Sequence, residues 1–296
     1  MGRRPQITNN MSIYLISTSH LEDDVWFRDE EDFRTGMNTV ATVQFNMGTV
    51  AVLAFILMSN HVHFVLEGRK RDVTTFMNKF KGSYSRHMRY KYGIKELLRR
   101  NDVDIRLLDG EESVERAIAY VLMNCVAANI CLHPVQYPWG SGSCIFSENP
   151  VRGIPATSLK KRELREMTHS KARFNNKYMV SNEGYILPES YVEVKKVESI
   201  FRTPKRMNYF LMSSSKSKQK MDEEPEVPAF RDQYVIAGIA DICTSLFRKN
   251  GIRELNEGEM TELLRQLRYR FSCNIHQLAR VAGLSYEEVV SCLDKV

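Results

Sequence analysis

The sequence predicts an α+β fold, in which helices pack against an antiparallel sheet, followed by a helical C-terminal domain. Two observations carry this prediction. Strand and helix patterns follow in the order β-α-β-β-α-α over about the first 150 residues, whereas the residues after 229 show helical patterns alone. With 296 residues, 43% of them hydrophobic, the chain is long enough for about two domains with buried cores.

Three apolar runs predict strands, at residues 12–19, 49–57 and 61–66. A Ser-Asn turn signal separates the second run from the third, so these two are expected to pair as a hairpin. Between the first and second runs, residues 30–45 repeat apolar side chains at helical spacing. A Met-Gly pair then ends this helix.

Two further helices are predicted after the hairpin. Phe76, Phe80, Tyr84 and Met88 are spaced by four residues, which places them on one face of a helix. Residues 113–124 also repeat apolar positions at helical spacing. The α+β domain is expected to end near residue 150, where the composition changes.

We expect three parts along the chain: residues 1–150, a connecting module and linker over residues 151–228, and a helix-turn-helix-like domain over residues 229–296. Residues 213–228 (SSSKSKQKMDEEPEVP) have the composition of an exposed linker. In the last part, two helix patterns flank a Gly-Leu turn, and Ser285 begins a Ser-x-x-Glu capping box.

Positive charge is concentrated in one segment. Residues 69–100 hold eleven Lys or Arg and two acidic residues, a net charge of +9, which exceeds the +6 of the whole chain. Tyrosines interleave with these cations, and this mixture suits a phosphate backbone with stacked bases. A solvated helix face is the alternative. The candidate DNA-binding residues are Lys79, Lys81, Tyr84, Arg86 and Arg89.

The third predicted strand begins with His61-Val62-His63. Residues two apart on a strand point to the same face, so both imidazoles can meet one metal ion. Two structural histidines are the alternative interpretation. The chain has neither an H-E-x-x-H motif nor a P-C-x-x-C motif, which excludes the corresponding metalloprotease and zinc deaminase sites.

Three sequence blocks resemble a known family. Residues 57–66 (LMSNHVHFVL) resemble the L-M-P-N-H-V-H-L-L-L block of the HUH single-tyrosine transposases, which include insertion-sequence and repeat-associated transposases. Residues 120–126 (YVLMNCV) resemble the family's Y-I-x-x-N-P-V setting, and residues 137–141 (YPWGS) resemble its Y-P-W-S-S. Serine and cysteine replace a proline in the first and second blocks, and the family's W-x-x-R-F block is absent. The resemblance covers about residues 10–147.

The resemblance implies a ferredoxin- or RRM-like nuclease domain, with Tyr120 as the nucleophile and His61 and His63 as ligands of Mg²⁺ or Mn²⁺. Spacing adds Asn124, which shares a helix face with Tyr120 and could supply an oxygen as the third ligand. Tyr120 as a core residue with its hydroxyl at the rim is the alternative. Tyr84 is the rival nucleophile, although its helical register favours packing.

The activity implied is metal-dependent nicking and strand transfer of single-stranded DNA through a 5′-phosphotyrosine, in transposition or in processing of repeat hairpins. The partner expected is hairpin-bearing single-stranded DNA, and a homodimer is a further option. A non-catalytic, domesticated protein that binds DNA hairpins or acts as a regulator is the alternative. No G-x-x-x-x-G-K-[ST] loop for nucleotide hydrolysis is present.

The remaining observations concern location and the C-terminal part. The longest apolar stretch, residues 50–58, is about half of what a bilayer crossing needs, and no membrane association is expected. Six cysteines without a C-x-x-C pair and without a secretion signal indicate thiols in a reducing cytoplasm. The resemblance implies a bacterial, nucleoid-associated protein.

Residues 229–296 hold nine basic and nine acidic residues, so DNA contact and a packing or oligomerisation role both stay open for this C-terminal part.

Overall fold

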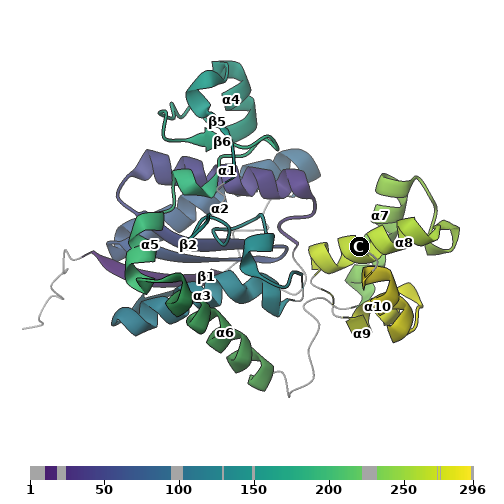
Figure 1. Cartoon of the computed structure of the whole chain (residues 1–296). Coiled ribbons are helices and arrows are strands. Elements are labelled where there is room, and N and C mark those ends of the chain that lie inside the picture. Colours follow the sequence, from purple (N-terminus) through teal and green to yellow (C-terminus); the bar gives the residue numbers. More distant parts are fainter. Residues whose placement is uncertain are drawn as a thin grey trace, which may run out of the picture.

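The computed structural model describes residues 11–18, 25–94, 103–128, 130–148, 151–221, 232–271, 273 and 275–294. Its centre is a four-stranded antiparallel sheet with the strand order β2-β3-β1-β4 (Figure 1). The strands are β1 (Ser12–Thr18), β2 (Ala51–Met58), β3 (His61–Gly68) and β4 (Val103–Leu108). With helices after β1 and β3, this is the ferredoxin-like arrangement, and the predicted fold class is confirmed.

The strand β4 is absent from the sequence-based prediction. It pairs with β1 at the edge of the sheet, and its residues are exposed or half-buried. An edge strand of this kind carries charged residues, here Asp104 and Arg106, so it lacks the continuous apolar run that marks β2 and β3.

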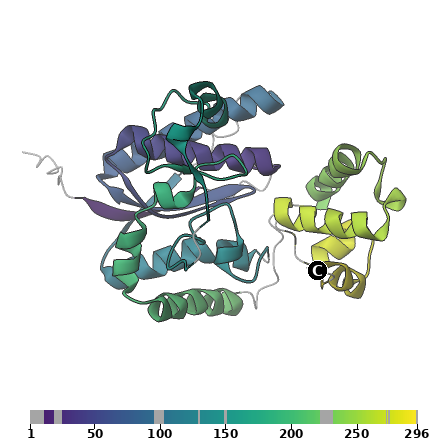
Figure 2. The same ribbon diagram turned by 45° about the horizontal axis from the view of Figure 1, so that its top comes forward.

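Helices cover both faces of the sheet. On one face lie α1 (Glu30–Met47) and α2 (Lys70–Tyr92), and on the other lie α3 (Glu111–Ala127) and α6 (Pro204–Met221) (Figures 1 and 2). On the first face, the ring of Phe64 of β3 packs edge-on against Phe76 and Phe80 of α2 and holds this helix on the sheet. The predicted helices over residues 30–45 and 113–124 correspond to α1 and α3, each slightly longer than expected.

The segment from residue 151 onwards packs on this sheet domain. Its elements are β5 (Ile154–Pro155), α4 (Lys161–Thr168), β6 (Met179–Val180), α5 (Val194–Phe201) and α6. Phe174, Val197 and Phe201 are buried in the same hydrophobic core as the sheet. Residues 151–211 therefore complete the first domain. The expected linker is helical up to Met221, and its remainder, residues 222–228, lies outside the described residues.

The C-terminal helices form a separate hydrophobic core, which includes Leu263, Leu267 and Leu278. The predicted capping box is present, because Glu288 N–H donates to Ser285 Oγ (3.2 Å) and Ser285 N–H donates to Glu288 Oε2 (2.7 Å). No helix in the described ranges is long and apolar enough to cross a membrane. The helices are α7 (Asp232–Phe247), α8 (Glu257–Phe271), α9 (Ile275–Ala282) and α10 (Tyr286–Asp294).

The YPWGS block runs along the free edge of β2 and fixes the chain that follows α3. Leu57 N–H donates to Trp139 O (2.8 Å), and Ser141 N–H donates to Phe55 O (3.0 Å). Only glycine fits between these bonds, since a Cβ on Gly140 would lie 2.8 Å from Phe55 O. The block thus acts as an additional edge segment of the sheet.

Candidate active site

Strand β3 presents its two histidines on the face covered by α3. Val62 and Phe64 point to the opposite face, where Phe64 meets α2. The rings of His61 and His63 lie 4.8 Å apart between centroids and are nearly perpendicular. Both are buried, with 7% and 1% of their surface exposed. The predicted convergence of the two imidazoles is present.

Each histidine ring is held by a hydrogen bond at Nδ1. His61 Nδ1 lies 2.7 Å from Asn60 Oδ1, and His63 Nδ1 lies 2.8 Å from Ser17 Oγ. Histidines that bind metals characteristically use one ring nitrogen for such a supporting bond and the other for the ion. With Nδ1 used in this way, Nε2 is the nitrogen of each ring that could bind a metal ion. Ser17 reaches the site because β1 pairs Ser17 with His63, a register that the sequence does not reveal.

Helix α3 brings Tyr120 next to the histidines. The Tyr120 ring lies 5.3 Å from the His63 ring between centroids, at an interplanar angle of 71°. Burial raises the pKa of the Tyr120 hydroxyl above its ordinary value, and a hydrogen bond with the Asn124 side chain acts in the opposite direction. The phenol is therefore protonated at neutral pH in this structure.

Asn124 lies one turn after Tyr120 and is 6% exposed. Its Nδ2 donates to the carbonyl oxygen of Tyr120 (2.7 Å), which ties the amide to the helix and leaves Oδ1 as its oxygen donor. Two imidazole nitrogens and one amide oxygen would make a donor set that suits Mg²⁺ or Mn²⁺, with further positions for water or phosphate. Within the described ranges, no cluster of three or more His, Cys, Asp or Glu offers an alternative site.

The structure corrects one predicted DNA contact. Tyr84 is fully buried, its ring packs against Phe27 and Phe80, and its hydroxyl donates to Trp26 O (2.6 Å). A base cannot stack on this ring, so the assignment of Tyr84 to DNA binding is wrong, whereas the packing that its register favours is confirmed. Burial also raises its pKa well above the ordinary tyrosine value.

The basic side chains of α2 do not join the histidine site. Lys79, Arg86 and Arg89 are exposed and Lys81 is half-buried, all on a helix that covers the other face of the sheet. Tyr90, which is absent from the predicted contacts, is 92% exposed at the end of the same helix. The two groups of candidate residues therefore occupy opposite faces of the sheet.

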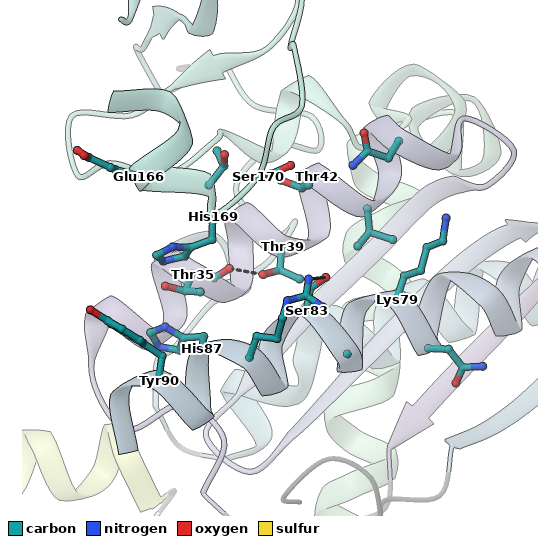
Figure 3. A pocket seen from close by; sticks show the side chains of 16 residues that line it. Thr35, Thr39, Thr42, Lys79, Ser83, His87, Tyr90, Glu166, His169 and Ser170 are labelled. Carbon is teal, nitrogen blue, oxygen red and sulfur yellow. Dashed lines mark hydrogen bonds between the residues drawn. The ribbon is translucent and has the colours of Figure 1, made fainter. Parts of the chain in front are cut away.

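A cavity of about 700 Å³ lies beside these cations, between α1, α2 and α4 (Figure 3). Threonines of α1 face Lys79, Ser83 and Tyr90 of α2 across it, and the end of α4 closes one side. The sequence gives no signal for this cavity, because α4 comes from a segment far from α1 and α2 along the chain.

A comparison with known protein families agrees with the predicted resemblance. The model of the family described as "Transposase IS200 like" matches residues 9–102, and over these residues the resemblance to the tyrosine transposases is confirmed. The match includes His61 and His63 and ends before Tyr120. No curated protein matches the chain.

One solved structure is similar to part of the chain, under the description "Structure of the REP associates tyrosine transposase bound to a REP hairpin". It is 10% identical, with a TM-score of 0.37, over 48% of this chain and 81% of that chain.

Proposed function

We propose that this protein nicks single-stranded DNA and transfers the cut strand, with Tyr120 as the nucleophile. The observation that carries the proposal is the contact between the Tyr120 ring and His63, beside His61. The match of residues 9–102 to IS200-like transposases supports DNA as the substrate. Hairpin-bearing DNA, a homodimer and a place at the bacterial nucleoid remain predictions.

In the first step, the Tyr120 oxygen attacks the scissile phosphorus. A bond forms between that oxygen and the 5′-phosphate, and the bond from phosphorus to the 3′-oxygen breaks. The phenol proton leaves to solvent, and the departing 3′-oxygen takes up a proton to become a hydroxyl. A 3′-hydroxyl that later attacks the phosphotyrosine reverses these changes and rejoins a strand, without nucleotide hydrolysis.

His61, His63 and Asn124 would hold the divalent cation, and the supporting bonds from Asn60 and Ser17 orient the two rings. A bound Mg²⁺ or Mn²⁺ would polarise the scissile phosphodiester as a Lewis acid. A protonated phenol is a poor nucleophile, so the positive charge of a bound cation would favour the attacking phenolate form of Tyr120.

The test uses the full chain and a panel of single-stranded hairpins labelled at the 3′ end, since the 3′ fragment carries the phosphate that joins Tyr120. With Mn²⁺ or Mg²⁺, we expect a labelled protein–DNA band that survives denaturing electrophoresis and disappears with a chelator or in Tyr120→Phe. Hairpin binding without this band, with either metal, would support the non-catalytic alternative instead.

A further inference from the structure

The cavity between α1, α2 and α4 is lined mainly by polar and charged side chains. Its volume, about 700 Å³, falls within the range of small-molecule and nucleotide sites. Thr35 and Thr39 are buried beneath it and line its floor, together with Thr42. The cavity therefore combines a polar floor with the charged and aromatic side chains of α2.

Four of these α2 side chains form a single stripe. Lys79, Ser83, Arg86 and Tyr90 are separated by four, three and four residues, so they share one face of the helix along the cavity. Figure 3 shows Lys79, Ser83 and Tyr90 of this stripe. Arg86 is positioned by its hydrogen bond to Ser83 Oγ (2.9 Å). Along this stripe, the cations Lys79 and Arg86 are followed by the aromatic ring of Tyr90 at the mouth of the cavity.

The charge of the cavity is positive. Lys79 and Arg86 both line it, and the carboxylate that also lines it, Glu166, is paired with Arg162 (2.8 Å). His87 is engaged by the buried Asp32 through Nε2 (2.7 Å), which ties that imidazole to the floor. An anionic ligand therefore meets two cations beside a carboxylate that is already paired.

Tyr90 supplies the second recognition element. Its side chain is 92% exposed, which is unusual for an aromatic residue and leaves its ring surface open to a ligand. Cations beside an open aromatic face are the combination that binds unpaired nucleotides, because the ring stacks on the base and the cations contact the phosphates.

We propose that this cavity binds an unpaired nucleotide of single-stranded DNA, with the base on Tyr90 and the adjoining phosphates at Lys79 and Arg86. The inference rests on the proposed DNA substrate, and it assigns a second contact on the sheet face opposite Tyr120. The α4 side of the cavity comes from residues beyond the matched range 9–102. Lys79, Arg86 and Tyr90, which would contact the nucleotide, lie within that range.

Binding is tested by fluorescence anisotropy with an unstructured, labelled single strand, in a Tyr120→Phe background that cannot cleave. We expect Tyr90→Ala to weaken binding about 5- to 160-fold, the cost of one base–aromatic stack. Tyr90→Trp should retain binding. Tyr209→Ala is the matched control, because Tyr209 is 66% exposed on α6, away from the cavity.

The double variant Lys79→Ala/Arg86→Ala should weaken binding and lower the slope of log K against log salt by about 1.4, which corresponds to two lost contacts with a single strand. Lys70→Ala/Arg71→Ala is the matched control, since both of its cations are exposed at the start of α2 and do not line the cavity.

A crosslink locates the base directly. A strand that carries 5-iodouracil at successive positions, irradiated on the full chain, should attach to Tyr90. Wild-type affinity in Tyr90→Ala together with crosslinks only elsewhere would overturn the proposal. Formation of the Tyr120 adduct is a separate readout, so the nuclease proposal can stand while the cavity proposal fails, and the reverse.

Discussion

The ring of Tyr120 on α3 meets the ring of His63 on β3 at 5.3 Å and at a steep angle, in a site closed by the packing of α3 on the sheet. His63 is fixed from behind by Ser17 of β1. The proposed nucleophile and a proposed metal ligand are thus positioned by two strands and a helix rather than by loops. Rigid placement of this kind is what an in-line phosphoryl transfer requires.

The first prediction concerns the metal ligands. Mn²⁺ should raise the melting temperature of the wild-type protein, because a cation that binds only the folded state stabilises it. His61→Ala/His63→Ala should lose both this shift and the nicking of single-stranded DNA while keeping its DNA affinity. His276→Ala, an exposed histidine of α9, serves as the control. An unchanged Mn²⁺ shift in the double variant would exclude these two ligands.

The second prediction concerns Ser17. Ser17→Ala removes the hydrogen bond that orients His63, so we expect Mn²⁺ affinity to fall about 10- to 100-fold, as is usual for the loss of a supporting partner. Calorimetric titration measures the change. Ser12→Ala on the same strand should bind Mn²⁺ like the wild type, and equal losses in both variants would mean that only strand stability was altered.

The third prediction concerns Asp32, which is fully buried and accepts hydrogen bonds from His87, Lys91 and Tyr92. Burial alone would raise the pKa of this carboxyl, but these hydrogen bonds and the charge of Lys91 outweigh burial and hold the pKa below its ordinary value. A lowered pKa contributes stability above the unfolded value of about 4, and this contribution is lost as the pH falls through the folded value.

Asp32→Asn should therefore lower the free energy of unfolding by about 3 kcal/mol at neutral pH. Urea denaturation at pH 7 and at pH 3 measures the difference, which should shrink at the lower pH. Asp104→Asn on the exposed edge strand is the control. If the difference in unfolding free energy between the wild type and Asp32→Asn were the same at both pH values, the ionised Asp32 carboxylate would not be the source of this stability.

The fourth prediction concerns Gly140. Alanine at this position would force Phe55 O away and break the pairing of the YPWGS block with β2, so the melting temperature should fall by several degrees. Gly82→Ala is the matched control, since a Cβ there meets nothing within 4 Å and alanine favours a helix interior. Equal melting temperatures for the two variants would show that the block tolerates displacement.

The sequence predicts the local part of the site well, for physical reasons. Strand alternation places His61 and His63 on one face, and helical spacing places Tyr120 and Asn124 on another. The contribution of Ser17 depends on the register between β1 and β3, which no local pattern encodes. No local pattern encodes the position of α2 either. Helix α2 lies on the sheet face opposite the histidines because it packs on Phe64, a contact between different elements.

Tyr84 and Tyr90 show that the positive charge of a helix does not predict which of its tyrosines are exposed. Both tyrosines lie among cations in the sequence, yet Tyr84 packs beneath Trp26 and Phe27, two residues that precede α1. Tyr90 lies nearly fully in solvent. The helical spacing of the hydrophobic residues distinguishes the buried tyrosine from the exposed one, whereas the local composition does not.

The central claim is that Tyr120 forms the covalent link to DNA. The most direct measurement is mass spectrometry of the peptide–DNA adduct after incubation with a hairpin-bearing single strand and Mn²⁺. We predict a 5′-phosphate on the Tyr120 peptide, no adduct in Tyr120→Phe, and a normal adduct in Tyr84→Phe, whose lost hydroxyl bonds only within the core. An adduct that persists in Tyr120→Phe and maps to another tyrosine would contradict the account.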